Sequence, residues 1–301
     1  MKAIVYEEYG GPEVLRLKEM AEPHPGPGQV RLKVVAAAVN PLDYKIRRGW
    51  MPQMGPAEFP AIPGQEASGI VDEVGPGVTG LSVGDEVLGW TDTGAYAAYA
   101  LATVVAPKPA DLDWESAAAL PVAAETSARV LDLLQLTDGE TLLLHGAAGV
   151  VGGVGVQLAV ARGATVIGTA SPANHDYLRS LGAIPVAYGE GLADRVRAVA
   201  PRGVDAVYDA AGQGDLPVSI ELRGGTTDRI VTIADIQAAD LGVTFSGGGD
   251  RSAEALADHA RLAAAGRLRV LIAQSYPLAD AAKAHEQSET GHTRGKLILR
   301  P

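Results

Sequence analysis

The sequence predicts an α/β protein in which a doubly wound parallel sheet is inserted into a smaller β domain. Up to about residue 113 the chain is rich in short β-strand signals, which glycine and proline clusters such as residues 23–28 separate. A glycine-rich turn then follows a buried apolar run at residues 141–145, and strand and helix signals alternate after it. That alternation favours a parallel sheet with helices on both faces.

Local patterns predict the elements in order. The strands expected in the β domain are apolar and β-branched runs at 3–6, 29–35, 69–74 and 85–88. Alanine-rich stretches predict helices at 115–120 and 126–134. After the glycine turn, strands are expected at 165–169, 184–188, 204–208 and 229–233. The chain closes with a helix, a strand, a helix and a strand at 253–266, 269–273, 278–289 and 296–299.

These signals divide the chain into three parts. We expect the β domain at 1–120, the parallel-sheet domain at 121–265, and a C-terminal segment at 266–301 that returns to the first domain. The length of 301 residues is sufficient for two domains with large cores, at the usual value of about 150 residues each.

The composition is that of an ordinary globular protein, with 47% hydrophobic and 20% charged residues. The formal net charge is −11 and the chain has no basic run, so neither nucleic acid nor an anionic membrane is expected as a partner. The chain has no cysteine, which excludes disulfides, thiolate catalysis and cysteine-ligated zinc. No apolar run approaches the ~18 residues of a membrane span, so we expect a cytoplasmic protein.

The glycine-rich turn predicts a dinucleotide-binding site. It reads Ala147-x-Gly149-x-x-Gly152, with Val150 and Val151 as the last two variable residues and Ala147 where the strict fingerprint has its first glycine. Because the turn opens an apolar helix, N–H groups at the helix start are free to meet a pyrophosphate. Turns of small residues also serve plain helix–strand packing.

Five segments match a family pattern in the same order: 40–49, 63–75, 83–87, 118–121 and 292–299. Together they resemble the medium-chain dehydrogenase/reductase superfamily, specifically its zinc-free quinone oxidoreductase (zeta-crystallin-like) branch. The resemblance covers nearly the whole chain. It implies a GroES-like β-barrel catalytic domain into which a Rossmann domain is inserted, and it implies a homodimer.

The chain departs from the zinc-dependent alcohol dehydrogenases of that superfamily at their metal ligands. Asn40 stands where they have a ligand cysteine and Gln65 where they have a ligand histidine, and their four-cysteine lobe is missing. Neutral amides are poor zinc ligands, so we expect no metal site, with Gln65 merely filling the vacated space. Without a metal to acidify an alcohol, the expected substrates are quinones and α,β-unsaturated carbonyls, which are already activated for hydride attack.

The end of the second Rossmann strand predicts the cofactor. NAD-selective folds carry an acidic residue about 20 positions beyond the glycine turn, whereas this chain has Ser171. A hydroxyl leaves room for a 2′-phosphate, so NADPH is expected over NADH. His175 offers a donor, although it is equally typical of a solvated helix residue, and Tyr188 matches a family tyrosine that faces this phosphate. The resemblance also implies that Thr126, at an expected helix start, and Ala234, at a later strand end, lie near the cofactor.

Three residues near the first family segment are candidates for catalysis. Asn40 is the expected donor to the substrate carbonyl, whose oxygen gains negative charge during hydride transfer. Asp43 and Lys45 follow it, and Lys45 would supply a cation near the mouth of the site. Plainer interpretations stay open: Asn40–Pro41 is a common turn dipeptide, and Asp43 can cap a helix that runs through Arg47.

Other residues carry weaker signals. An apolar group either lines a hydrophobic pocket or belongs to the core: Tyr44, Trp50, Met51 and Met54. His145 is expected to be a packed residue at a strand end, and no metal is expected at His285 and His292.

The sequence therefore predicts a zinc-independent, NADPH-dependent reductase that transfers a hydride to a quinone or an α,β-unsaturated carbonyl. One alternative is a catalytically idle NADPH-binding redox sensor, which would bind NADPH without turnover. Another is an enoyl-thioester reductase, whose carrier protein or coenzyme A would require a basic patch that a net charge of −11 disfavours.

Overall fold

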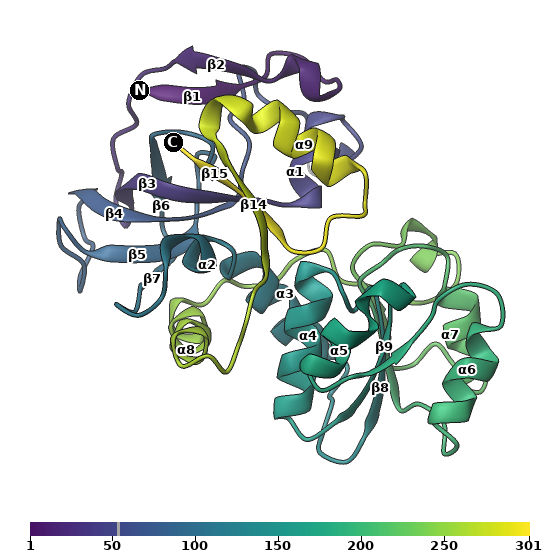
Figure 1. Ribbon diagram of the computed structural model, residues 1–301. Helices are drawn as coiled ribbons and strands as arrows, with labels where there is room; N and C mark the ends of the chain where they lie inside the picture. Colours follow the sequence, from purple (N-terminus) through teal and green to yellow (C-terminus); the bar gives the residue numbers. More distant parts are fainter. Residues whose placement is uncertain (53–54) are drawn as a thin grey trace. The chain divides into compact units, whose positions relative to one another are not determined.

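The computed structural model describes residues 1–52 and 55–301 and divides into two compact units. Unit 1 comprises Met1–Val122 and Arg251–Pro301, and unit 2 comprises Ala123–Asp250 (Figure 1). Residues 251–265 thus group with unit 1, although the sequence signals placed them with the parallel sheet. Within the described residues, no helix is long and apolar enough to cross a membrane.

The main sheet of unit 1 has seven strands. Its path runs β14 (Ile272–Pro277), β15 (Lys296–Arg300), β3 (Val30–Val39), β4 (Glu66–Val74), β5 (Glu86–Trp90) and β7 (Val105–Pro107), with β6 (Tyr99–Ala102) also paired to β3. β15 pairs with β3 in antiparallel register, so the end of the chain lies beside its first long strand. β1 (Lys2–Val5) and β2 (Arg16–Glu19) form a separate antiparallel pair.

The helices of unit 1 pack on these strands. They are α1 (Pro41–Arg47), α2 (Trp114–Ala118), α8 (Ala253–Ala264) and α9 (Ala281–Glu289), with short 3-10 helices η1 (Pro12–Val14) and η5 (Leu278–Asp280). α8 packs against β7, which explains why it groups with unit 1. α9 lies beside α1 and η1, so the C-terminal segment covers the helix that follows β3 (Figure 1).

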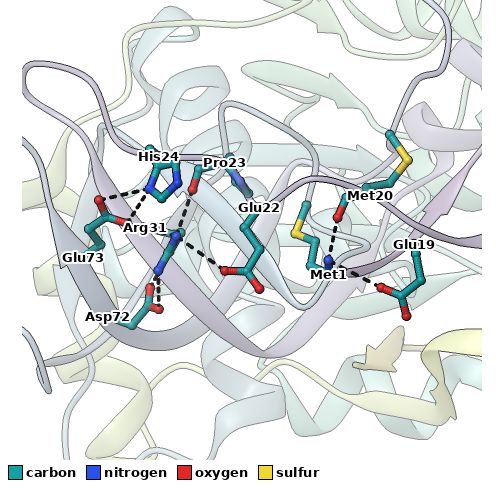
Figure 2. A network of polar contacts seen from close by, with 9 residues as sticks. All are labelled: Met1, Glu19, Met20, Glu22, Pro23, His24, Arg31, Asp72 and Glu73. Carbon is teal, nitrogen blue, oxygen red and sulfur yellow. Dashed lines mark hydrogen bonds and ion pairs between the residues drawn. The ribbon is translucent and has the colours of Figure 1, made fainter.

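A charged network joins β3 and β4 to the N-terminal segment (Figure 2). The Arg31 guanidinium donates to both carboxylate oxygens of Asp72, each at 2.9 Å, and to the carbonyl oxygen of Pro23 at 3.1 Å. It also pairs with Glu73 at 2.9 Å, and His24 Nδ1 lies 3.0 Å from the same carboxylate. A bidentate arginine of this kind holds the register of the neighbouring strands.

Unit 2 is a six-stranded parallel sheet of the doubly wound type. Its order is β10 (Ile184–Val186), β9 (Thr165–Thr169), β8 (Thr141–His145), β11 (Ala206–Asp209), β12 (Ile230–Thr232) and β13 (Thr244–Phe245). The helices are α3 (Pro121–Leu133), α4 (Val150–Ala161), α5 (His175–Ser180), α6 (Leu192–Val199) and α7 (Leu216–Leu222), with η3 (Pro172–Asn174) and η4 (Ile236–Ala238).

Each face of this sheet buries its own hydrophobic core. Leu142 and Leu144 of the central strand β8 pack with residues of α3, α4 and α5. Leu143, which points to the opposite face, packs with residues of α6 and α7 instead. Alternation along one strand therefore serves two helical layers. Figure 1 shows α4 and α5 on one side of β8 and β9, and α6 and α7 on the other.

Two expected elements differ from the structure. The helix expected from Thr126 begins earlier, at Pro121, because proline fits the first helical turn, where its missing N–H costs no bond. The strand expected at 269–273 is displaced to Ile272–Pro277. β14 is an edge strand in which no residue is buried, so its sequence lacks the apolar alternation that identifies strands with one buried face.

Candidate active site and nucleotide-binding turn

The glycine-rich turn connects β8 to α4. The N–H of Gly149 donates to the carbonyl oxygen of Gly146 at 3.0 Å, and Gly146 adopts a φ of 70°, which favours glycine. A Cβ atom at Gly152 would lie 2.2 Å from that same carbonyl oxygen. Ala147, which replaces the first fingerprint glycine, is fully buried and donates its N–H to the carbonyl oxygen of Thr169 at 3.2 Å. The turn is therefore too tight for a side chain at Gly152.

The geometry of the turn fits a pyrophosphate. Gly149 is the N-cap of α4, and a Cβ there would meet only the carbonyl oxygen of Gly146 within 4 Å, at 3.3 Å, so its outer side is open. Val150, Val151 and Gly152 form the first turn of this helix, where an α-helix offers no carbonyl acceptor to their N–H groups. Free donors at the positive end of a helix dipole are suited to an anion.

Ser171 and Tyr188 follow the carboxyl ends of the neighbouring strands β9 and β10. Thr169 pairs with Val186, and the N–H of Ala170 donates to the Val186 carbonyl at 3.0 Å. Ser171 and Tyr188 each follow two residues beyond that pair, and the Tyr188 side chain is 57% exposed. Ser171 is half-buried, and its hydroxyl accepts from Asn174 Nδ2 at 3.2 Å. Ser171 and Tyr188 thus lie at the carboxyl ends of parallel strands, where such sheets bind ligands.

The remaining cofactor candidates lie at other places in unit 2. His175 starts α5, and its Nε2 lies 3.4 Å from the carbonyl oxygen of Ala170. The structure places Thr126 within α3, with its hydroxyl 3.3 Å from a carboxylate oxygen of Glu125. Ala234 follows β12, and its N–H donates to the Thr232 hydroxyl at 3.1 Å. Ala234 thus lies at the carboxyl end of a parallel strand, the edge where such sheets bind ligands.

In unit 1, Asn40 belongs to a buried polar network. Its Nδ2 donates to Glu66 Oε1 at 2.8 Å, and its Oδ1 accepts from Lys296 Nζ at 2.6 Å. Lys296 Nζ also lies 2.6 Å from Glu66 Oε1, and Glu66 Oε2 accepts the N–H of Val122 at 2.7 Å. The relative exposure of Asn40, Glu66 and Lys296 is 5%, 0% and 3%. Because Lys296 only donates and Glu66 only accepts, the Asn40 carboxamide has a single satisfactory orientation.

A second buried chain leads from Arg47 to Asp43. Arg47 Nη1 lies 2.9 Å from His285 Nδ1, and an arginine can only donate, so this ring nitrogen accepts. His285 Nε2 therefore carries the proton and donates to the Tyr96 hydroxyl at 3.2 Å, which donates to Asp43 Oδ2 at 2.9 Å. The same Asp43 oxygen accepts the N–H of Asn40 at 2.8 Å. Asp43 thus caps α1, the plainer role that the sequence left open.

Burial shifts the pKa values at both ends of this chain. Burial raises the pKa of Asp43 to about 7, although the hydrogen bonds from Asn40 and Tyr96 oppose the shift. Burial also lowers the pKa of His285 to about 3, and the nearby charge of Arg47 adds to that effect. One oxygen of Asp43, Oδ1, is buried without a partner within the described part of the chain.

The other residues near α1 are less constrained. Lys45 is half-buried, and its ammonium forms no ion pair with any described carboxylate. Tyr44 and Trp50 meet edge to face at 6.4 Å between ring centroids, and Trp50 is 60% exposed, so it is not a core residue. Met51 is half-buried, and Met54 lies outside the described residues. In the chain as described, no three His, Asp or Glu residues are grouped so that they could hold a metal.

Sequence reasoning assigned no role to Glu66, Tyr96 or Lys296. A usable signal was present for two of them, because Glu66 and Lys296 are charged residues at the starts of apolar strands. Such charges are rarely buried unless they are paired. His285 was expected only to lack a metal, and it instead links α9 to Tyr96 through a hydrogen bond.

Two family models match the chain. The model described as alcohol dehydrogenase GroES-like domain matches residues 26–109, and the model described as zinc-binding dehydrogenase matches residues 181–299. With the six-stranded parallel sheet of unit 2, these matches confirm the predicted fold, a Rossmann domain inserted into a GroES-like catalytic domain.

Known proteins are similar over the whole chain. The 2-methylene-furan-3-one reductase of Solanum lycopersicum is 33% identical, with 100% of this chain and 79% of that protein covered. The NADPH-dependent alkenal/one oxidoreductase, chloroplastic, of Arabidopsis thaliana is 32% identical, with 100% and 80% covered. The crystal structure of Escherichia coli quinone oxidoreductase complexed with NADPH is 28% identical, covers 100% of both chains and superimposes with a TM-score of 0.87.

Replacing Gly152 tests the tightness of the turn. We expect Gly152→Ala to lower the free energy of unfolding by roughly 1–3 kcal/mol, because its Cβ would overlap a backbone oxygen at 2.2 Å. The matched control is Gly153→Ala, whose Cβ would approach the Tyr177 hydroxyl, the far end of a movable side chain, at 3.0 Å and would make ordinary contacts with Leu181 Cδ1 at 3.6 Å and the Ala147 carbonyl oxygen at 3.7 Å. Urea denaturation of both variants measures the effect. Equal stability of the two variants would contradict the described turn.

The shifted pKa values predict opposite pH dependences for two variants. A raised pKa at Asp43 means that its contribution to stability is complete below its usual value of 3.8 and is lost as the pH rises through about 7. A lowered pKa at His285 means that its contribution is complete above 6.5 and is lost as the pH falls toward about 3. Each effect is on the order of 4 kcal/mol, so in the native chain they largely cancel.

We therefore expect the free energy of unfolding of Asp43→Asn to rise between pH 4 and pH 6.5, and that of His285→Gln to fall over the same interval. Denaturant titrations at several pH values measure both profiles against the native chain. Parallel profiles for the three proteins would show that these two groups are not buried as described.

Proposed function

The chain belongs to the quinone oxidoreductase branch of the medium-chain dehydrogenase/reductase superfamily, and from that membership we propose a metal-independent, NADPH-dependent reductase of α,β-unsaturated carbonyls or quinones. The names of the tomato and Arabidopsis relatives specify conjugated carbonyl substrates, and that of the Escherichia coli relative specifies a quinone. Both substrate classes accept a hydride without a Lewis acid, because conjugation spreads the added electron pair.

NADPH, when bound, supplies the hydride, and the protein contributes binding and orientation. We assign the pyrophosphate to the turn around Gly149, Val150, Val151 and Gly152, with Ala147 as a packing residue beneath it. Ser171, His175 and Tyr188 are assigned to the adenosine 2′-phosphate. Thr126 and Ala234 are assigned to the remainder of the cofactor. The open side of Gly149 and the free N–H groups of α4 support the first assignment.

The fixed Asn40 carboxamide is the observation that carries the proposed reductase chemistry. Its oxygen faces Lys296, and one of its two amide hydrogens faces Glu66, which leaves the second hydrogen to donate to the substrate carbonyl oxygen. A donor that is already oriented stabilises developing negative charge without reorganisation. Asp43 holds the backbone of Asn40 at the start of α1, and Lys45 is assigned as a nearby cation.

The surroundings of Asn40 also support the proposed absence of zinc. The Asn40 oxygen is already bonded to the Lys296 ammonium at 2.6 Å. A zinc ion bound through that oxygen would lie close to a buried positive charge and would be repelled by it. Gln65, at the second former ligand position, offers another neutral amide.

Kinetics of the protein after EDTA treatment test this proposal. We expect oxidation of NADPH, faster than that of NADH, by members of a panel of quinones and conjugated ketones. Asn40→Ala should lower kcat by about 100-fold, the usual effect of removing one donor to a developing oxyanion. Glu66 and Lys296 remain paired with each other in that variant, so its fold should persist.

Gln65→Ala is the matched control and should change kcat little. The described hydrogen bond of Gln65 is made by its backbone carbonyl oxygen, which accepts the N–H of Thr91 at 2.9 Å and is kept in the variant. NADPH binding without turnover of any acceptor would contradict the proposed reductase and would favour an NADPH-binding sensor instead. Turnover that requires added metal would contradict the metal-independent mechanism.

We also propose a homodimer. β13 ends the parallel sheet, so one edge of it has no described partner strand, and Phe245 on this strand is 46% exposed. An open edge with an exposed aromatic residue is suited to pairing with a second copy. Light scattering should give twice the chain mass of 30.9 kDa, and Phe245→Pro should shift the protein toward the monomer by removing the edge N–H of β13 that faces away from β12. A monomeric native protein would refute the dimer.

A further inference from the structure

One arginine organises the loop that follows β10. Arg195 of α6 donates from Nε to the carbonyl oxygen of Ala187 at 3.0 Å and from Nη1 to that of Glu190 at 2.7 Å. Its Nη2 donates to the carbonyl oxygens of Tyr188 at 3.3 Å and Gly189 at 3.1 Å. Four consecutive carbonyl groups thus converge on one guanidinium. Only the planar five-donor fork of arginine satisfies such an arrangement.

The four hydrogen bonds from Arg195 fix the backbone position of Tyr188. Carbonyl dipoles that point to one place repel each other, so without the guanidinium the 187–190 loop would relax to another conformation. Tyr188 is the residue of this loop that lies two positions beyond the pairing of Val186 with Thr169, at the sheet edge that also carries Ser171. Arg195 therefore orders the backbone beside the proposed 2′-phosphate site, although its own α-carbon lies in the following helix.

Arg195 also differs from the neighbouring arginines in its charge balance. Arg179 is paired with Asp176 at 2.6 Å, and Arg197 is paired with Asp194 at 3.4 Å. Arg195, in contrast, bonds only to carbonyl oxygens and to no carboxylate of the described chain. Its positive charge is therefore not neutralised, and it is half-buried next to the Tyr188 backbone.

We propose that Arg195 is the positioning residue that makes this protein select a 2′-phosphorylated nucleotide: it holds Tyr188 in place and supplies the uncompensated positive charge beside the phosphate. The proposal rests on the NADPH-dependent function proposed above and deepens it. It also explains how NADPH is preferred although no lysine or arginine follows Ser171 directly in the sequence. The positive charge that favours the 2′-phosphate thus comes from α6, the helix that follows β10.

Binding of two nucleotide fragments tests this without catalysis. Calorimetry compares adenosine 2′,5′-bisphosphate with 5′-AMP, which differ only in the 2′-phosphate, on the native chain, Arg195→Gln and Arg195→Lys. We expect Arg195→Gln to weaken binding of the bisphosphate about tenfold and to leave 5′-AMP unchanged, because one ordered loop and one charge are lost. Arg195→Lys keeps the charge and should give an intermediate loss. Arg197→Gln removes an equal charge from the same helix and is the matched control, with no expected change.

The outcomes separate this proposal from the function on which it rests. Equal weakening of both fragments in Arg195→Gln would show a general structural role and would overturn the proposal, as would no change in either. A native chain that binds both fragments equally would also overturn it while leaving an NADH-dependent reductase open. A native chain that binds neither would overturn the nucleotide-binding function itself. If Arg195→Gln fails to fold, Arg195→Lys decides, with hydrogen exchange of residues 187–190 reporting whether the loop has loosened.

Discussion

A buried ion pair between Glu66 and Lys296 holds together the part of unit 1 on which the proposed chemistry depends. Glu66 begins β4 and Lys296 begins β15, and the carboxylate also accepts the N–H of Val122, which belongs to unit 1 as well. Asn40 bridges the two charges. Removal of one partner from such a pair typically costs about 3–5 kcal/mol, because the other charge remains buried. The carboxamide orientation is thus maintained by interactions that the fold cannot easily lose.

The series of hydrogen bonds from Arg47 through His285 and Tyr96 to Asp43 has a fixed donor-to-acceptor direction. Since Arg47 can only donate, each hydrogen of His285 and Tyr96 has one satisfactory position, and the chain ends on the carboxylate that caps α1. Arg47 is itself fully buried and pairs with Glu289 at the end of α9. The C-terminal helix therefore helps to orient the segment that carries Asn40, which gives the tail a role in the site as well as in the sheet.

Sequence reasoning was most successful where the interaction is local. The turn from Ala147 to Gly152, the alternation after it, and the capping role of Asp43 all depend on residues within a few positions of each other. The Lys296–Asn40 bond spans 256 positions, and periodicity does not show which buried charge meets which. The loop around Tyr188 is a further example, because the four carbonyl groups that gather on Arg195 belong to the backbone and leave no trace in the residue types.

Transfer of deuterium from NADPH labelled at C4 tests the central claim most directly. Metal-free protein, verified by elemental analysis, is mixed with each of the two C4-deuterated forms and with a quinone or conjugated ketone, and the NADP+ formed is examined by mass spectrometry. A site that orients its cofactor predicts loss of deuterium from one form and retention in the other. Deuterium lost equally from both forms, or NADP+ formed only after zinc is restored, would contradict a metal-independent hydride transfer.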